Sequence, residues 1–105
     1  MRKLNHIGIP TSEVMPNENY MEGAKLYVTD FAESPNKIEW LRFEEGSPMP
    51  ELLKTTAHIA YEVEDLEAEL KDANVLMEPF QPNENLTVAF VIEEGAPIEL
   101  MKFNN

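Results

Sequence analysis

Two histidines and two glutamates occupy matching places in the two halves of the sequence and form a plausible ligand set for one divalent metal ion. His6 lies in the stretch Asn-His-Ile-Gly and His58 in Ala-His-Ile-Ala. Glu39 and Glu99 each follow an isoleucine, in the hexapeptides Ile-Glu-Trp-Leu-Arg-Phe and Ile-Glu-Leu-Met-Lys-Phe. Each half of the chain therefore runs from a histidine to a glutamate.

The types of these side chains limit which metals they could bind. Histidine nitrogens and carboxylate oxygens together favour zinc, nickel, iron, manganese or cobalt over calcium, which prefers oxygen alone. The sequence has no cysteine, so thiolate ligands, disulfides and cysteine nucleophiles are excluded. Four protein ligands could close a tetrahedral structural site, or they could leave two positions of an octahedral ion open for water or substrate.

The four residues must lie on strands, whose alternate side chains point to opposite faces. The pattern predicts strands at 3–9, 24–29 and 37–44 in the first half, and at 56–63, 75–78, 86–92 and 97–103 in the second. The neighbours of the candidate ligands are apolar and suit the opposite, helix-covered face: Ile7, Ile38, Trp40, Ile59, Ile98 and Leu100. Glu62 shares the predicted face of His58 and is therefore the rival carboxylate to Glu99.

One helix is predicted over 66–73, where strong helix formers follow Asp65 as a potential N-cap. A single helical turn is expected from Pro50 to Leu53, and a hairpin turn from Glu93 to Ala96. Residues 11–23 and 79–85 are predicted to be loops because prolines and asparagines interrupt them. The second half therefore has the order strand, helix, three strands, and the first half resembles it with a reduced helix.

The length of 105 residues fits a single domain. We expect a first module over about 1–46, a linker over about 47–55 and a second module over about 56–105. The net charge of −12 repels phosphate backbones and anionic membranes, so neither nucleic acid nor membrane is an expected partner. No apolar run approaches the length of a membrane span, and we expect a cytoplasmic protein.

Along essentially its whole length, the chain resembles the vicinal oxygen chelate superfamily in a short form. That superfamily includes glyoxalase I, methylmalonyl-CoA epimerase, extradiol dioxygenases and bleomycin-binding proteins. The resemblance lies in His-Ile-Gly-Ile at 6–9, in His-Ile-Ala-Tyr-Glu-Val at 58–63 followed by Glu-Asp-Leu, and in Ile-Glu-Leu at 98–100. It implies an α+β fold with two βαβββ modules, whose curled mixed sheet surrounds a central cleft, and metal ligands at His6, Glu39, His58 and Glu99.

The resemblance also implies a function. Such a protein chelates two neighbouring oxygens of a small substrate on its metal and acts as a glyoxalase-like isomerase, lyase or epimerase. A carboxylate that loosens from the metal would be the general base, Glu99 first and Glu39 second. No cluster of cations marks a glutathione or coenzyme A site, and the few candidates are Arg2, Lys3, Lys25, Lys37 and Arg42.

Two alternatives stay open. The chain could be a small-molecule-binding protein of the same fold, like the bleomycin-resistance proteins, which does not turn its ligand over. Aromatic residues that could line its cleft are Tyr20, Tyr27, Phe43, Phe80 and Phe103. The repeat could also serve only folding and dimerisation. A homodimer is expected in each case, since two-fold dimers are the commonest assembly and this superfamily often builds its sites across one.

Overall fold

Strands dominate the computed structural model, which describes residues 1–104 and has an α+β fold. The chain divides into two compact units. The first, which we call the N-terminal unit, contains residues 6–57. The second, the C-terminal unit, combines residues 1–5 with residues 58–104. Each unit is described below by itself.

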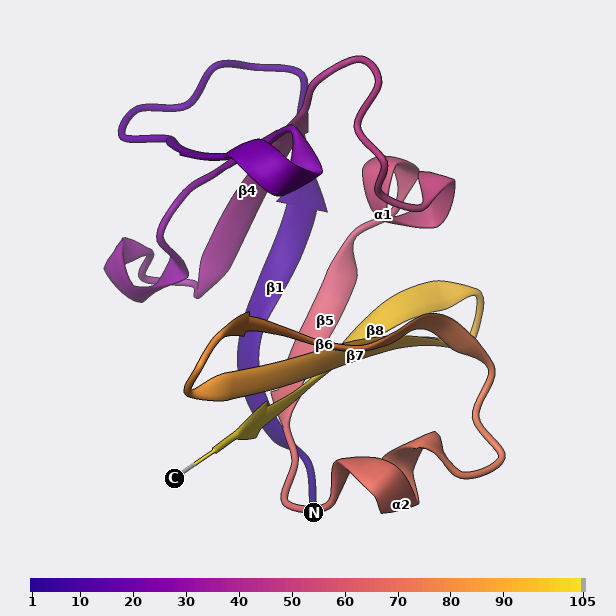
Figure 1. Ribbon diagram of the computed structural model, residues 1–105. Coiled ribbons are helices and arrows are strands. Elements are labelled where there is room, and N and C mark those ends of the chain that lie inside the picture. Colours follow the sequence, from indigo (N-terminus) through magenta and orange to yellow (C-terminus); the bar gives the residue numbers. More distant parts are fainter. Residues whose placement is uncertain (105) are drawn as a thin grey trace. The chain divides into compact units, whose positions relative to one another are not determined.

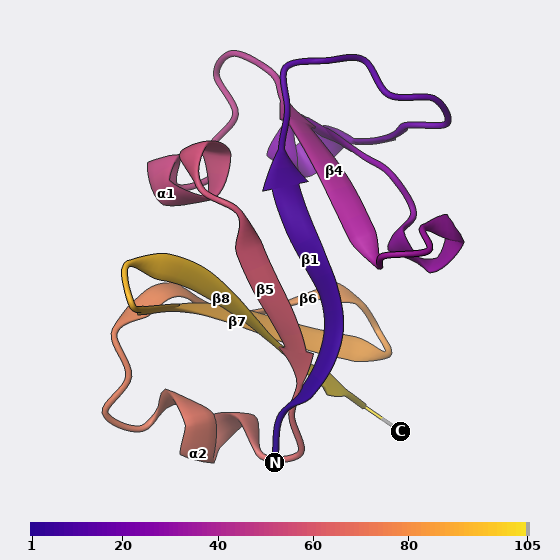
Figure 2. The ribbon, with the colours of Figure 1, turned by 180° about the vertical axis from the view of Figure 1, so that it is seen from behind.

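The N-terminal unit has four strands in the order β2-β3-β4-β1, and β1 and β4 run parallel while the other neighbours are antiparallel. Figure 2 shows β1 and β4 side by side. One 3-10 turn lies between β2 and β3, another lies between β3 and β4, and a short helix follows β4. The elements are β1 (Lys3–Pro10, which begins in the other unit), β2 (Asn19–Met21), η1 (Glu22–Ala24), β3 (Leu26–Val28), η2 (Phe31–Glu33), β4 (Ile38–Phe43) and α1 (Glu51–Thr55).

The C-terminal unit has four strands in the order β5-β8-β7-β6 and one helix. Strands β5 and β8 are parallel, and β8, β7 and β6 are antiparallel. The elements are β5 (His58–Glu62), α2 (Leu66–Leu70), β6 (Val75–Asn83), β7 (Leu86–Glu93) and β8 (Ala96–Phe103). In Figure 1, α2 lies on one side of β7 and β8.

The hydrophobic core of the C-terminal unit lies between its sheet and α2. Leu66 of the helix packs with alternate residues of the strands, among them Val91, Ile98 and Leu100. Ile59 packs against the same cluster, so this module has the helix-covered apolar face that the alternation predicts. The opposite face of the sheet carries the side chains of His58, Ala60, Phe90 and Glu99.

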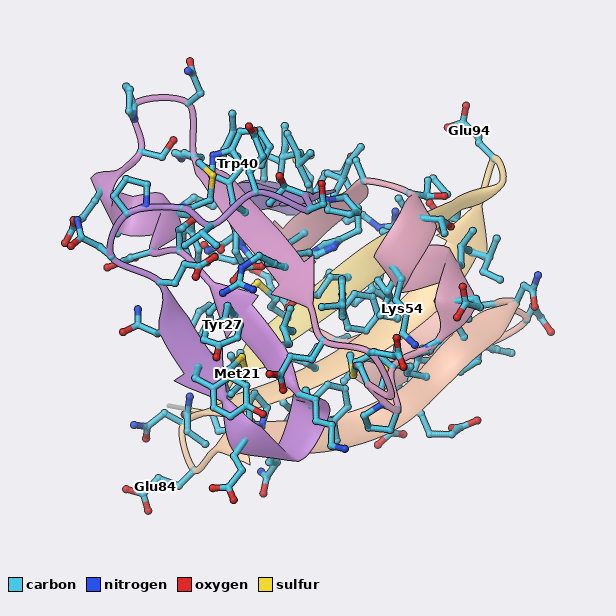
Figure 3. The ribbon with its side chains drawn as sticks, turned by 90° about the horizontal axis from the view of Figure 1, so that it is seen from above. Met21, Tyr27, Trp40, Lys54, Glu84 and Glu94 are labelled. Carbon is cyan, nitrogen blue, oxygen red and sulfur yellow. The ribbon has the colours of Figure 1, made fainter. Side chains whose placement is uncertain are left out.

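On the corresponding face of the N-terminal unit, the described residues that line the sheet come from loops and a 3-10 turn and none from an α-helix. Ile38 and Trp40 there line a hollow of about 600 Å³ together with Met15 and Pro16 of the preceding loop. In Figure 3, Trp40 lies among the side chains of this region. Pro16 and Asn17 in the preceding loop explain the difference, because proline lacks the backbone N–H that a helix needs and asparagine favours turns.

Two expectations about local structure were wrong in extent. The predicted loop at 79–85 continues the strand, since β6 extends to Asn83. Its pairing with β7 shifts register three times, which is how an outer strand accommodates Pro79 and Pro82. The predicted helix at 66–73 ends at Leu70, because Lys71 is extended and Asp72 has a positive φ of 63°.

Other local predictions are confirmed. Asp65 caps α2 by accepting a hydrogen bond from the Ala68 amide at 3.1 Å. The turn between β7 and β8 has positive φ at Glu94 and Gly95, and Glu94 projects from the hairpin tip in Figure 3. The short strand β2, within the predicted loop 11–23, was not expected. Within residues 1–104, none of the helices has the length and apolar character needed to cross a membrane.

Candidate metal centre

The N-terminal unit brings His6 and Glu39 together. Strands β1 and β4 are parallel, and Glu39 lies opposite Gly8, two residues beyond the histidine. Residues two apart on a strand share a face, so the imidazole and the carboxylate point to the same side of the sheet. His6 Nε2 lies 3.6 Å from Glu39 Oε1.

The C-terminal unit repeats this arrangement with His58 and Glu99. Strands β5 and β8 are parallel, and Glu99 lies opposite Ala60, again two residues beyond the histidine. His58 Nε2 lies 3.0 Å from Glu99 Oε1. Each unit thus presents one histidine–glutamate pair in the same strand register.

Both pairs are removed from bulk water. His6 is 2% exposed, His58 3% and Glu99 9%, while the Glu39 side chain retains 19% of its exposure. Burying a carboxylate is costly unless a hydrogen-bond donor, an opposite charge or a metal compensates it. The imidazole beside each carboxylate is one such compensating group, at 3.6 Å from Glu39 and 3.0 Å from Glu99.

Aromatic rings contact both imidazoles, and neither ring is among the five aromatic residues expected to line a cleft. Phe31 of η2 stacks on His6 with centroids 4.2 Å apart and planes inclined by 16°. Phe90 of β7 meets His58 edge-on, at 5.5 Å and 83°. Of the five expected residues, Tyr20 and Tyr27 contact each other, and Phe80 and Phe103 are exposed.

The sequence held a signal for one of these two aromatic residues. A hairpin turn at Glu94 and Gly95 pairs Glu93 with Ala96, and counting outwards from it places Phe90 opposite Glu99. The predicted hairpin therefore already implied that Phe90 lies beside a candidate ligand. No comparable rule places Phe31, since it belongs to a 3-10 turn between two strands.

Glu62, the rival carboxylate, has another partner in the C-terminal unit. Its Oε2 accepts a hydrogen bond from the side-chain amide of Asn5 at 2.9 Å. It lies at the end of β5 opposite Met101, whereas Glu99 approaches the His58 ring. Within this unit the carboxylate beside the histidine is therefore that of Glu99.

Two of the cations considered for an anionic cosubstrate are bound to carboxylates. The Arg2 guanidinium donates two hydrogen bonds to Glu93, at 2.9 and 2.8 Å, and one to Glu69 at 3.0 Å. Arg42 donates to both oxygens of Glu18, at 2.9 and 2.7 Å. These contacts lower the pKa of Glu93 and of Glu18, and both guanidinium groups are occupied in holding the fold.

Comparison with known proteins supports the fold. No family model matches the sequence, and no curated protein matches it. A hypothetical protein from Bacillus halodurans C-125 has a similar structure, with a TM-score of 0.72 and 19% identity over 99% of this chain and 96% of that one. Methylmalonyl-CoA epimerase from Mycobacterium tuberculosis has a TM-score of 0.62 and 16% identity over 95% of this chain and 87% of that one.

These likenesses establish the architecture and nothing finer. Both structures align over nearly the whole chain, so the α+β fold with repeated strand modules is confirmed. The superfamily that the sequence resembles includes methylmalonyl-CoA epimerases, and the second likeness agrees with that resemblance. At this level of identity, the activity of a similar structure does not transfer to this chain.

Proposed function

We propose that this chain is a small metal-dependent isomerase, epimerase or lyase of the glyoxalase-like kind. In this proposal His6, Glu39, His58 and Glu99 hold one divalent metal ion, and the substrate carries two neighbouring oxygen atoms. The observation that carries the proposal is the repeated histidine–glutamate pair, in which each glutamate lies opposite the residue two positions beyond its histidine. Two pairs of this composition match the ligand preferences of zinc, nickel, cobalt, manganese and iron.

The metal, when bound, would act as a Lewis acid that stabilises negative charge on the substrate oxygens. The imidazoles of His6 and His58 would each supply one nitrogen donor. The carboxylate of Glu99 removes the proton next to the substrate carbonyl, and Glu39 is the second choice for this role. The contacts of Phe31 and Phe90 with the imidazoles limit the access of water to the donor groups.

The fold likeness supports this class of reaction. One similar structure is described as a methylmalonyl-CoA epimerase, and epimerisation begins with the proton abstraction proposed for Glu99. A coenzyme A thioester is a less suitable substrate here, because Arg2 and Arg42 are paired with glutamates and the net charge is −12. We therefore expect a compact, oxygen-rich substrate without a large anionic carrier.

Metal stoichiometry tests the proposal most directly. Purified protein is loaded with Ni²⁺, Co²⁺ or Zn²⁺, desalted and analysed for bound metal. One ion per chain is expected, and both His6→Ala and His58→Ala should lose it, because one ion needs both pairs. Glu62→Gln is the matched control and should keep the ion. Two independent ions per chain, or unchanged metal content in both alanine variants, would refute the shared site.

The second candidate is a binding protein of the same fold that does not turn its ligand over. The aromatic rings of Phe31 and Phe90 beside the two imidazoles favour it, because aromatic side chains commonly line small-molecule sites. A ligand-induced rise in Tm that is the same with and without a chelator would identify this function. A rise that disappears with the chelator would instead support the metal-dependent proposal.

We also propose that the protein works as a homodimer, because two-fold dimers are the commonest assembly among soluble oligomers. Light scattering coupled to size-exclusion chromatography measures the mass directly. Twice the chain mass of 12.0 kDa is expected. A measured mass equal to that of one chain, at micromolar protein concentration, would contradict this part of the proposal.

A further inference from the structure

We infer that Phe31 is a positioning residue whose ring fixes the plane of the His6 imidazole and thereby sets the metal affinity of the site. This inference rests on the proposed function, because it concerns the same metal ion. It adds a residue that the sequence pattern does not mark and that lies on a connecting turn, outside the repeated strands.

The contact between the two rings is close and nearly parallel. The centroids of Phe31 and His6 lie 4.2 Å apart with an angle of 16° between the planes. The lone pair of an imidazole nitrogen lies in the plane of the ring, so the plane sets the direction in which His6 would offer its nitrogen to a metal ion. A ring stacked against one face resists tilting, and orientation of a histidine ligand by its neighbours raises metal affinity.

The turn that carries Phe31 is held by hydrogen bonds at both ends. The Asp30 carboxylate accepts from the Ala32 amide at 2.9 Å and caps η2. The Phe31 carbonyl accepts from the Ser34 amide at 3.1 Å. The Ser34 hydroxyl oxygen in turn accepts from the Ile38 amide at 3.0 Å, which ties the turn to β4 next to Glu39.

The same connection is attached to the strand that carries the histidine. The amide of Ile7 donates to the carbonyl of Lys37 at 2.9 Å. Lys37 has a positive φ of 57°, so the chain reverses there before entering β4. The segment from Asp30 to Lys37 is thus joined to both strands of the pair, and Phe31 is placed on His6 by backbone contacts on either side.

The aromatic contact in the other unit differs in kind and provides a contrast. Phe90 is 5% exposed in β7 and approaches His58 edge-on at 83°. It lies opposite Glu99 in the sheet, so its removal would leave a cavity in the strand core. Phe31 is half-buried in a surface turn, so it can be shortened with a much smaller effect on folding.

Titration with Ni²⁺ or Zn²⁺ tests the inference, with metal affinity measured for wild type, Phe31→Leu, Phe31→Tyr and the matched control Trp40→Leu. Phe31→Leu should weaken binding by about 10- to 100-fold, the range found when a group that orients a metal ligand is removed. Phe31→Tyr retains the stacked ring and should bind within a few-fold of wild type. Trp40 is on β4 in the same unit and lines the hollow on the sheet face opposite to Glu39, so Trp40→Leu should leave affinity unchanged.

An NMR measurement on the metal-free protein separates positioning from loss of folding. The His6 ring protons should be shifted upfield in wild type and Phe31→Tyr by the stacked aromatic ring, and the shift should disappear in Phe31→Leu while the remaining spectrum stays folded. If Phe31→Leu binds the metal as tightly as wild type does, the inference is overturned and the proposed function stays intact. Wild-type protein that binds no metal would overturn both.

Discussion

His58 and Glu99 approach to 3.0 Å across two parallel strands, and the glutamate lies opposite Ala60, two residues after the histidine. His6 and Glu39 have the same register on β1 and β4, with Gly8 in the place of Ala60. Small residues at both places leave room for the histidine and glutamate side chains to meet above the strands. The two histidine–glutamate pairs therefore match both in residue type and in strand register.

Metal binding should stabilise the wild-type protein and fail to stabilise a variant without the His58–Glu99 pair. A ligand that binds only the folded state at 100 times its Kd adds about 2.7 kcal/mol to the free energy of unfolding. Saturating Zn²⁺ or Ni²⁺ should therefore raise the Tm of wild type, measured by circular dichroism. The double variant His58→Ala/Glu99→Gln should show no rise, and Glu62→Gln should behave as wild type. An equal rise in the double variant would show that the metal binds elsewhere.

The contact of Arg2 with Glu93 should make stability depend on pH in the acid range. Their hydrogen bonds lower the pKa of Glu93, so the folded state favours the ionised carboxylate. A lowered folded-state pKa stabilises the protein above the unfolded-state pKa of about 4.3, and this stability is lost as pH falls through the folded-state value.

Urea unfolding at pH 7 and pH 3 measures this contribution. Glu93→Gln should reduce the free energy of unfolding at pH 7 by about 1 kcal/mol, the usual size for a partly exposed bidentate pair. The difference between variant and wild type should shrink at pH 3, where the wild-type carboxylate also takes up a proton. Glu94→Gln removes the same charge at the neighbouring turn position and serves as the control. A difference that is equal at both pH values would contradict the ionic origin.

Tyr20 should titrate at a higher pH than an ordinary tyrosine. Its hydroxyl donates a hydrogen bond of 2.6 Å to Glu44 Oε1, which raises the pKa of Tyr20 to about 12. Because the neutral phenol is the favoured form, the stability from this contact is present below about pH 10 and is lost as pH rises through the folded-state value.

Absorbance at the phenolate band follows this titration. One of the three tyrosines should ionise near pH 12 in wild type. Tyr20→Phe should remove that step, and Glu44→Gln should move it towards about 10, the ordinary tyrosine pKa. Glu45→Gln is the adjacent control and should leave the late step in place. A late step that survives in Glu44→Gln would assign it to another cause.

The β7–β8 hairpin can be stabilised at its turn. Glu94 and Gly95 have φ of 56° and 79°, the left-handed pair for which Asn-Gly is the preferred sequence. Glu94→Asn should raise the free energy of unfolding by about 0.5–1 kcal/mol, since asparagine tolerates this conformation better than glutamate. Urea unfolding measures the change.

Gly95→Ala should have the opposite effect, of about 1–2 kcal/mol. A Cβ at this position would meet no atom within 4 Å, so backbone conformation alone sets the cost. Glu84→Asn, in the turn of the β6–β7 hairpin, substitutes the same residue type in a different turn. A gain there as large as at Glu94 would show that charge reduction, and not turn geometry, causes the stabilisation.

Much of this protein could be predicted from local sequence rules. Within each unit, the alternation of side chains places the histidine on the opposite face of its strand from the isoleucine that follows it, and Asp65 marks the start of α2. The Glu94–Gly95 turn fixes which residues of β7 and β8 lie opposite each other, including Phe90 and Glu99. These features depend on residues close together in the chain, where periodicity and turn chemistry act directly.

Other features were decided only by the tertiary structure. Phe31 reaches His6 from a 3-10 turn 25 positions away, and Arg2 reaches Glu93 at a separation of 91. Pro79 sits inside a strand because neighbouring pairing outweighs its local preference. Such contacts depend on which surfaces the packed sheet brings together. Local sequence rules do not select among possible partners that are distant in the chain. The sequence alone determined the candidate ligands and the strands that carry them. The tertiary structure decided which other side chains contact those ligands.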